Sequence, residues 1–254
     1  MVPKVIHYCW LSGDPYPRLI KQCMKTWKEK LPDYEFVKWD LNRFSLGKSL
    51  WVKSAFEAKK YAFAADYIRI YALYHFGGIY LDSDVQVLKS FNELLDLPYF
   101  IGQENKDGFI EAATMGFEKG HPLLKRLLEY YEGRSFIKDG GTMDMQTVPN
   151  IILKHINDSY HYRIINNKKD FDFSQDTICV FPPDYFSPKD CDTKQVSLTN
   201  NTYSIHHFDG SWVKPSIKEV GFWKYLRIKL ALRTRINKLI EYNESAYICN
   251  CTCI

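Results

Sequence analysis

The hydrophobic pattern of the chain opens with a strand, a helix and a second strand. Residues 4–10 (KVIHYCW) are a short apolar run closed by the turn residues SGDP at 12–15, which predicts a buried strand. Residues 17–32 carry apolar side chains at helical spacing, and residues 34–40 (YEFVKWD) predict the next strand. Elements in this order are typical of an α/β sheet, in which ligands bind at the carboxyl ends of the strands.

The next segment combines a long helical pattern with a strand that carries two acidic residues. The helical pattern over 54–76 stops at the glycine pair 77–78, which predicts a C-terminal cap. Residues 78–88 (GIYLDSDVQVL) predict a strand that runs into Asp82 and Asp84. Further strands are expected at 98–104 and 108–118, and further helices at 121–133 and 147–157. No internal repeat or Gly- and Ser-rich linker divides this pattern, so we expect one main domain.

Composition narrows the class of protein. With 46% hydrophobic and 25% charged residues the chain has the make-up of a soluble globular protein, and its net charge of +4 does not indicate a nucleic-acid partner. The seven cysteines are scattered without paired spacing, which favours reduced thiols. The first residues do not resemble a signal peptide, and no window approaches the ~20 apolar residues that span a bilayer. These features predict a cytoplasmic protein.

Asp82 and Asp84 are the first candidates for chemistry. Residues i and i+2 of an extended strand point to the same face, so these carboxylates can converge on one hard divalent cation. Oxygen ligands of this kind suit Mg²⁺ or Mn²⁺, which share their remaining positions with water and phosphate oxygens. Two alternatives remain open at this point. The pair can lie on a solvated turn without binding a ligand. It can also belong to a phosphatase that forms an aspartyl phosphate, although such enzymes usually carry their acids nearer the N-terminus.

Four segments, taken in order, carry a family resemblance. They are residues 3–10 (PKVIHYCW), 32–40 (PDYEFVKWD), 58–88, which includes AADYIRIYALYHFGGIYLDSDVQVL, and 204–212 (SIHHFDGSW). Together they resemble the bacterial capsule-type members of glycosyltransferase family 32, and more distantly the yeast initiating mannosyltransferases and the glucosylating domain of clostridial toxins. The resemblance implies a GT-A fold over residues 1–215. In this fold a Rossmann-like mixed α/β sheet, flanked by helices, binds a nucleotide sugar.

The resemblance also implies a chemistry and a role for each aspartate. It implies a nucleotide-sugar donor, a Mn²⁺ or Mg²⁺ ion, and transfer that retains the configuration of the anomeric carbon. Asp82 and Asp84 correspond to the metal-binding Asp-x-Asp, where the metal bridges the two phosphates of the donor and offsets their charge as the diphosphate leaves. His207 corresponds to the histidine that completes the metal shell, and the adjacent His206 remains a competitor for that role.

Several donor-binding positions follow from the same resemblance. Asp66 and Arg69 lie three residues apart on one helix face, where the family places an acid and an arginine that grip the hexose hydroxyls. The alternative for this pair is an exposed ion pair of little energetic value. Trp10 corresponds to an aromatic residue that stacks on the uracil base, with core packing as its alternative. Tyr80 is a donor-site candidate with the same alternative.

Positions nearer the C-terminus complete the candidate site. Ser211 and Trp212 match the terminal Ser-Trp of the family and are expected to close over the diphosphate. On the acceptor side, residues 139–149 (DGGTMDMQTVP) contain Asp144, the candidate for a catalytic acid. Retaining transfer proceeds either through a covalent carboxylate intermediate or by front-face attack, and the sequence identifies no nucleophile.

A basic stretch near the C-terminus forms a separate region. Residues 222–240 (FWKYLRIKLALRTRINKLI) predict a basic amphipathic helix within a C-terminal region of residues 216–254. Such a helix can lie on an anionic membrane surface or pack against the main domain. The membrane alternative would place the protein on the inner face of the plasma membrane, close to acceptors carried on polyprenyl diphosphate.

These observations together predict a function. We expect a metal-dependent, retaining glycosyltransferase that moves a hexose, galactose or glucose, from a UDP-sugar to a growing surface or capsular glycan linked to a lipid. The alternative is a catalytically inactive protein of the same fold that binds carbohydrate or acts as a scaffold. The presence of Asp66, Arg69, Asp82, Asp84 and His207 together favours the enzyme.

Overall fold

A five-stranded mixed sheet forms the centre of the structure, a computed structural model that describes residues 1–104 and 108–209. The strand order is β2-β1-β3-β6-β5; β1 runs parallel to β2 and β3, and β6 runs antiparallel to β3 and β5. The bounds are Val5–Cys9 for β1, Glu35–Trp39 for β2, Gly78–Leu81 for β3, Tyr99–Gln103 for β5 and Ile110–Phe117 for β6. The carboxyl ends of β1, β2 and β3 therefore lie at one edge of the sheet.

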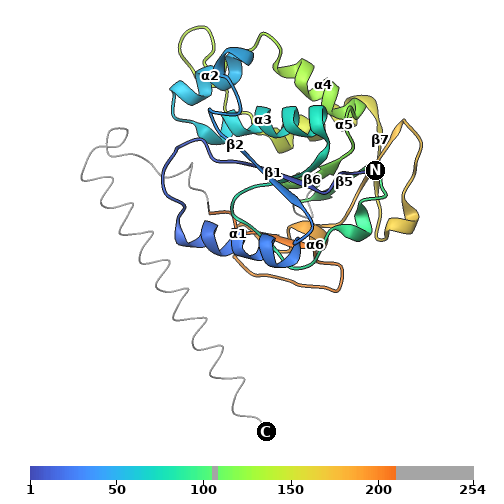
Figure 1. Ribbon diagram of the computed structural model, residues 1–254. Helices are drawn as coiled ribbons and strands as arrows, with labels where there is room; N and C mark the ends of the chain where they lie inside the picture. The colour runs from blue at the N-terminus through green and yellow to red at the C-terminus, as the bar shows by residue number, and fades with distance from the viewer. Residues whose placement is uncertain (105–107, 210–254) are drawn as a thin grey trace. The chain divides into compact units, whose positions relative to one another are not determined.

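Helices cover both faces of this sheet (Figure 1). α1 (Arg18–Lys30) and α6 (Pro183–Phe186) lie on one face, and the other four helices lie on the opposite face. Those four are α2 (Leu50–Glu57), α3 (Tyr61–Phe76), α4 (Pro122–Tyr131) and α5 (Val148–Ser159). Short 3₁₀ turns occur at Leu46–Lys48, Asn92–Leu94 and Lys168–Asp170. The predicted fold class, a mixed α/β sheet flanked by helices, is confirmed.

Two small ribbons lie beside the central sheet. β4 (Val85–Val87) pairs antiparallel with β9 (Ser204–His206), and β7 (His161–Ile164) runs parallel to β8 (Thr177–Val180). The β4–β9 ribbon is tied to α1, because the indole of Trp27 donates a hydrogen bond to the Val85 carbonyl oxygen at 2.7 Å. This ribbon brings the last part of the described chain next to the segment that follows β3.

The single helix predicted over 54–76 is wrong in its extent, because two helices occupy this stretch. A break separates α2 from α3, and Lys59 lies in it with a left-handed backbone at φ 58°. The indole of Trp51 donates a hydrogen bond to the Phe63 carbonyl oxygen at 2.7 Å. In one continuous helix these two residues would be about 18 Å apart. The break therefore allows the two helices to pack against each other.

α3 is buried over most of its surface, which carries polar side chains into the protein. Its buried residues include Asp66 and Arg69. The helix ends at Gly77 (φ 66°) and Gly78 (φ 107°), so the predicted glycine cap is confirmed. A Cβ on Gly78 would lie 2.6 Å from the carbonyl oxygen of Val5 on β1. Only glycine therefore lets β3 start this close to β1.

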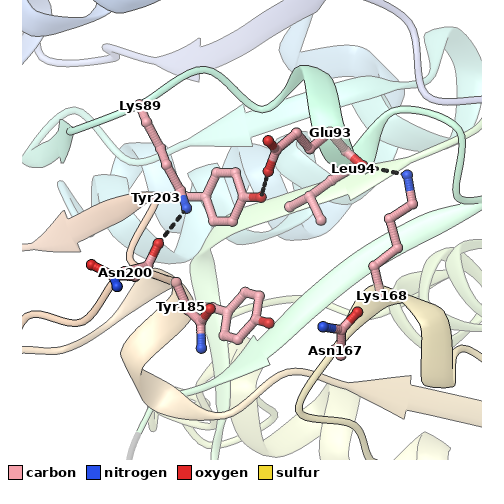
Figure 2. Close-up of a pocket in the computed structure, with 9 residues that line it drawn as sticks. Lys89, Glu93, Leu94, Asn167, Lys168, Tyr185, Asn200 and Tyr203 are labelled. Carbon is pink, nitrogen blue, oxygen red and sulfur yellow. Dashed lines mark hydrogen bonds between the residues drawn. The ribbon is translucent and has the colours of Figure 1, made fainter.

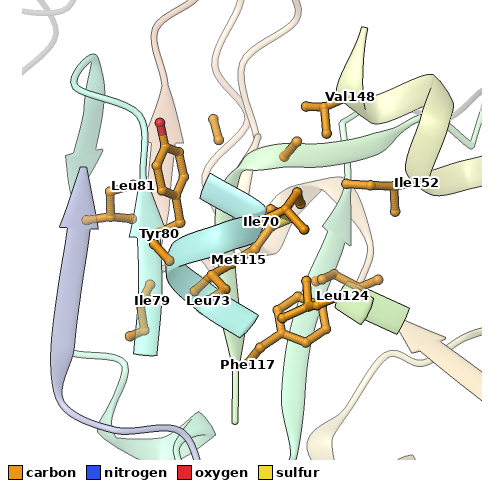
Figure 3. Packing of buried hydrophobic residues seen from close by; sticks show 14 of the residues in the cluster. Ile70, Leu73, Ile79, Tyr80, Leu81, Met115, Phe117, Leu124, Val148 and Ile152 are labelled. Atoms are coloured by element: carbon orange, nitrogen blue, oxygen red, sulfur yellow. The ribbon is translucent and has the colours of Figure 1, made fainter. Parts of the chain in front are cut away.

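Apolar packing fixes α3 against the sheet (Figure 3). The side chains that meet there come from α3, β3, β6, α4 and α5, and they are buried. They are Ile70, Leu73, Tyr80, Met115, Phe117, Leu124, Val148 and Ile152. Burying a large apolar side chain contributes about 1.5–3 kcal/mol. The position of α3 relative to β3, and hence of its polar residues relative to the end of β3, is determined by this core.

Residues 1–209 form one compact unit. Within the part of the chain that the structure describes, no helix is long and apolar enough to cross a membrane. The predicted boundary between residues 215 and 216 and the predicted basic helix at 222–240 lie outside the described residues. They therefore remain predictions.

Candidate functional site

The two aspartates lie on a turn and not in an extended strand. β3 ends at Leu81, residues 82–84 turn, and the Asp82 carbonyl oxygen accepts a hydrogen bond from the Val85 amide at 3.0 Å. The expectation that strand geometry places Asp82 and Asp84 on one face is therefore wrong. The physical reason is a change of partner, because β3 pairs with β1 and β6 whereas β4 pairs with β9. The chain has to bend between the two strands.

Asp82 is held rigidly at the carboxyl end of β3. Its amide donates to the Ala113 carbonyl oxygen of β6 at 2.8 Å. Its Oδ1 accepts from the Tyr80 hydroxyl at 3.0 Å and from Arg69 Nη2 at 3.2 Å. Oδ2 has only a 3.5 Å contact with Arg69, and the side chain is 27% exposed. Oδ2 is therefore the oxygen of Asp82 that is best placed for a ligand.

Arg69 is the centre of a buried charge network. Its Nη2 lies 3.1 Å from Asp66 Oδ1, and its Nη1 donates to the Ala112 carbonyl oxygen at 2.6 Å. The guanidinium also stacks over the Tyr80 ring, 4.6 Å from its centroid. Arg69 is 5% exposed and Asp66 is 7% exposed. The prediction that these two residues share a helix face is confirmed, and the alternative of an exposed ion pair is wrong.

Burial raises the pKa of Asp66 to about 6, against the opposing effect of Arg69. The nearby Asp82 carboxylate raises it further. Burial is the main cause of the raised pKa of Asp66, and the Arg69 guanidinium, which also contacts Asp82, offsets only part of it.

Asp66 should make the stability of the protein depend on pH between about 4 and 6. The pKa of Asp66 is raised from 3.8 to about 6 on folding, so its stabilising contribution is complete below pH 3.8 and is lost as the pH rises through 6. Asparagine cannot titrate. From pH 4 to pH 7 the free energy of unfolding of Asp66→Asn should therefore increase relative to wild type, by about 2 kcal/mol. Urea unfolding at pH 4, 5, 6 and 7 measures this difference.

An exposed aspartate provides the control for this pH dependence. The pKa of Asp33 is lowered by its hydrogen bond with Lys4, so its contribution is lost as the pH falls, and Asp33→Asn should show the opposite and smaller trend. A difference between Asp66→Asn and wild type that does not change with pH would contradict the prediction.

Asp84 is more deeply buried than Asp82. Its side chain is 14% exposed, and its Oδ2 accepts from the Asp209 amide at 2.9 Å. Its Oδ1 lies 3.7 Å from Nε2 of His206. Burial raises the pKa of Asp84, and His206 acts in the opposite direction. The two aspartates thus differ in surroundings: Asp82 is paired with Arg69, and Asp84 faces a histidine.

The two adjacent histidines have different partners. The His206 imidazole lies beside Asp84. The Nε2 of His207 is 3.0 Å from Gln86 Oε1, and Lys189 donates to the His207 carbonyl oxygen at 2.9 Å. Burial lowers the pKa of His207 to about 4, with Lys189 adding to the effect. Of the two competitors, His206 is the one that faces the aspartates, while a ligand role for either stays a prediction.

One residue of the site has no counterpart in the sequence-based expectations. Glu111, in β6, is fully buried, and its Oε2 lies 3.4 Å from His206 Nδ1. Burial alone would lower the pKa of His206, but Glu111 raises it to about 9; burial alone would raise the pKa of Glu111, but His206 lowers it. Burial, and then Glu111, raises the pKa of the nearby Glu104 to about 7. The sequence signal for Glu111 is one charge inside the run 109–117 (FIEAATMGF).

The aromatic donor-site candidates occupy different settings. Trp10 follows β1, its ring lies 4.8 Å from the Tyr16 ring, and its indole donates to a carbonyl of the following turn at 2.7 Å. It is partly exposed at the carboxyl edge of the sheet. Tyr80 is 1% exposed. Its ring stacks against the Arg69 guanidinium and its hydroxyl donates a hydrogen bond to Asp82, so it helps to hold both charged groups in place. Both donor roles remain predictions.

Asp144 is the remaining candidate among the described residues. Asp144 is buried; its Oδ1 accepts from the Gln146 amide at 3.3 Å and lies 3.5 Å from Lys138 Nζ. Over residues 1–104 and 108–209, no hydrogen bond or ion pair joins Asp144 to the two aspartates of the turn. Ser211 and Trp212 lie outside the described residues. The roles predicted for these three residues are untested by the geometry.

A comparison with protein families bears on this cluster of charges. Residues 17–101 match the family described as a glycosyltransferase sugar-binding region containing a DXD motif. The match includes Asp66 and Arg69 on α3 and the Asp82–Asp84 turn, which is the DXD sequence of this chain. The resemblance to DXD-containing glycosyltransferases is confirmed.

The chain is also similar to curated proteins and to a solved structure. Inositol phosphoceramide mannosyltransferase 3 of Schizosaccharomyces pombe is 32% identical over 50% of this chain and 36% of its own length. The initiation-specific alpha-1,6-mannosyltransferase of Candida albicans is 23% identical, with 86% of this chain and 74% of that protein covered. The structure of the PaToxG glycosyltransferase is 18% identical over 62% of this chain and 69% of its own, with a TM-score of 0.47. The chain spans just over a third of the length of the first inositol phosphoceramide relatives.

The side chains of the turn in the matched region fit a hard divalent cation that is shared with a substrate. No group of three or more His, Cys, Asp and Glu residues among those described is arranged to hold a metal by itself. Asp82 and Asp84 instead offer carboxylate oxygens at the edge of the sheet. Mg²⁺ is commonly bound through one or two carboxylates together with substrate phosphates and water. The donor set therefore suits a cation that arrives with a diphosphate.

Two cavities lie outside this cluster among the described residues. An open cavity of about 510 Å³ at the carboxyl end of β2 is lined by Lys38, Asp40, Asn42 and Arg43. A smaller cavity of about 190 Å³ lies at the other end of the β4–β9 ribbon (Figure 2). Its polar groups already have partners: the Tyr203 hydroxyl donates to Glu93, Lys89 donates to the Asn200 carbonyl, and Lys168 pairs with Asp96. These contacts link the segments around the smaller cavity to one another and so have a structural role.

Proposed function

We propose that the protein is a glycosyltransferase that moves a hexose from a nucleoside diphosphate sugar to a glycan. One observation carries this proposal. Asp82 and Asp84 lie on a turn at the carboxyl end of β3, within the matched sugar-binding region, and Asp82 is tied to the buried pair of Asp66 and Arg69. This edge of an α/β sheet is where such folds bind their ligands, and paired carboxylates there suit a cation with a diphosphate.

The residues of the site would divide the work between binding and orientation. A bound Mn²⁺ or Mg²⁺ ion would supply positive charge that stabilises the leaving diphosphate. Asp82 and Asp84 would hold that ion. Arg69 and Tyr80 would keep Asp82 Oδ1 in place, so that Oδ2 faces the ligand. Asp66 and Arg69 would contact hexose hydroxyls, as the family resemblance implies.

For the donor we propose a UDP-hexose, galactose or glucose, and for the stereochemistry retention at the anomeric carbon. The family resemblance of the sequence supports both. The fungal relatives are named as mannosyltransferases, so a mannose donor belongs in the same test. The anomeric configuration of the product, read by NMR, decides between retention and inversion.

For the acceptor we propose a glycan linked to a lipid, such as polyprenyl diphosphate, in the synthesis of a surface or capsular polysaccharide. The name inositol phosphoceramide mannosyltransferase, borne by one relative, supports a lipid-borne acceptor. We place the protein in the cytoplasm at the inner face of the plasma membrane, with residues 222–240 against anionic lipid. Sedimentation with anionic and with neutral vesicles tests this location.

UDP with Mn²⁺ should raise the melting temperature of the protein. A ligand that binds only the native state adds about 2.7 kcal/mol at a concentration one hundredfold above its dissociation constant. For a chain of this size that corresponds to a shift of roughly 5–10 °C. Differential scanning fluorimetry with UDP, with and without Mn²⁺, measures it, and the Asp84→Asn variant should lose the part that depends on Mn²⁺. A panel of UDP-galactose, UDP-glucose, UDP-N-acetylglucosamine and GDP-mannose then identifies the donor by hydrolysis.

The alternatives make different predictions in this experiment. A shift with GDP and Mn²⁺, without one for UDP, would replace the UDP-hexose donor by a mannose donor. Binding of a nucleotide sugar without hydrolysis or transfer would favour the inactive carbohydrate-binding or scaffold protein. No shift with any nucleotide would contradict the proposed function.

A further inference from the structure

Glu111 is a fully buried carboxylate whose compensation comes mainly from one side chain. It lies in β6 opposite Gly102 of β5, with 0% of its surface exposed. Its Oε1 accepts from the Ala113 amide at 2.6 Å, and its Oε2 lies 3.4 Å from His206 Nδ1. A buried carboxylate is costly unless it is paired and hydrogen-bonded. The chain therefore maintains a costly charge at this position in contact with His206.

The contact with Glu111 determines which nitrogen of His206 faces the aspartates. With Nδ1 turned to Glu111, Nε2 points to Asp84, 3.7 Å from its Oδ1. This separation is too long for a hydrogen bond. It is short enough for one cation to contact both atoms, because each bond to such an ion is about 2.1 Å long. The pairing of His206 with Val85 positions the backbone, and Glu111 orients the ring.

The neighbouring histidine lacks this arrangement. Neighbouring residues of an extended segment point to opposite faces, and His207 meets Gln86 instead of a carboxylate. A histidine that binds a metal almost always presents its other ring nitrogen to a carboxylate, a carbonyl or water, which sets the tautomer and orientation. Glu111 supplies such a carboxylate to His206 alone of the two.

We propose that Glu111 is a positioning residue of the donor site, which orients His206 through Nδ1 and so presents Nε2 to the cation and diphosphate at Asp84. The inference rests on the proposed function for the identity of what binds there. The orientation of the ring is a property of the protein by itself. The two can therefore be tested separately.

Manganese affinity tests the consequence for binding. Free Mn²⁺ is measured by EPR in titrations of the full-length chain with UDP present, for wild type, Glu111→Gln, His206→Ala and the matched control Gln86→Ala. Glu111→Gln should weaken Mn²⁺ binding by about 10- to 100-fold, as loss of such a partner usually does, and His206→Ala at least as much. Gln86→Ala, which removes the partner of the other histidine, should leave the affinity unchanged. Wild-type affinity in Glu111→Gln, or a loss in Gln86→Ala alone, would overturn the proposal.

Nitrogen NMR of the histidine rings tests the orientation without any metal. In wild type without ligand, at a pH above the raised pKa of about 9, where the ring is neutral, the His206 ring should carry its single proton on Nδ1, and Glu111→Gln should change the ¹⁵N shifts of that ring. A wild-type His206 ring that lacks a proton on Nδ1 would overturn the proposal, even if Glu111→Gln fails to fold. If wild type binds no Mn²⁺ while the NMR result is as expected, the proposed function fails and the role of Glu111 in orienting His206 stands.

Discussion

The substitution Asp84→Asn should reduce sugar transfer by about 10²- to 10³-fold while leaving the fold intact. A cation that offsets the charge of a leaving diphosphate contributes several kcal/mol to the transition state, and each 1.36 kcal/mol is a factor of ten in rate. Asparagine keeps an oxygen to accept the Asp209 amide. Because burial raises the pKa of Asp84, a neutral side chain should not lower the free energy of unfolding. Initial rates with the identified donor, together with a thermal melt, measure both effects.

A matched control tests whether the loss of rate is specific to the turn or follows from removing any aspartate. Asp33 pairs with Lys4 on the surface, away from the turn, and Asp33→Asn should keep the wild-type rate. Turnover retained by Asp84→Asn would refute the cation role of the turn. A melting temperature far below that of wild type would instead mean that Asp84 has a structural role that the geometry does not suggest.

Of the single substitutions proposed for this protein, Arg69→Met should lower the free energy of unfolding the most, by about 3–5 kcal/mol. Methionine occupies a similar volume but leaves Asp66 and Asp82 without their shared cation and the Ala112 carbonyl oxygen without its donor. Breaking a buried pair by removing one partner costs about this much, because the remaining charge is uncompensated. Urea unfolding at pH 7 measures the loss.

A second substitution tests the origin of this loss. In the variant with both Arg69→Met and Asp66→Asn, one of the uncompensated charges is gone, so the double variant should be more stable than Arg69→Met alone. Residues in direct contact usually show coupling energies of 0.5–3 kcal/mol in such a cycle. Strict additivity of the two substitutions would mean that the ion pair contributes little. Arg69→Lys, which keeps the charge but not the forked geometry, should fall between wild type and Arg69→Met.

Much of the fold follows from local pattern. The strands at 4–10 and 34–40 and the helix that Pro122 opens occur close to where the periodicity of the sequence predicts them. The helix over 54–76 is the instructive failure. The sequence around Lys59 contains no glycine or proline to mark a break, and the two helices are joined across it by the hydrogen bond from the Trp51 indole to the Phe63 carbonyl oxygen. The helical spacing of apolar residues in a sequence does not indicate such a contact between two helices.

The site was predictable in residue type but not in geometry. Asp66, Arg69, Asp82 and Asp84 could be selected because their spacing and resemblance point to a cation and a sugar. Their arrangement on a turn could not, because the bend results from a change of strand partner between β3 and β4. Glu111 was missed for a related reason. A single acidic residue in an apolar run carries no motif, and its contact with His206 joins residues 95 positions apart.

The β4–β9 ribbon limits how the proposed sugar-transfer activity can be moved between proteins by exchanging sequence segments. The matched segment 17–101 contains the DXD turn but neither β6, which anchors Asp82 and Arg69, nor β9, which carries His206. A chimera that exchanges only that segment between two relatives would therefore inherit the motif without the surroundings that orient it. During synthesis, likewise, a nascent chain stays incompetent until residue 206 has left the ribosome and paired with Val85. The DXD sequence can be moved with segment 17–101, but the positions of its side chains depend on β6 and β9, which lie outside that segment.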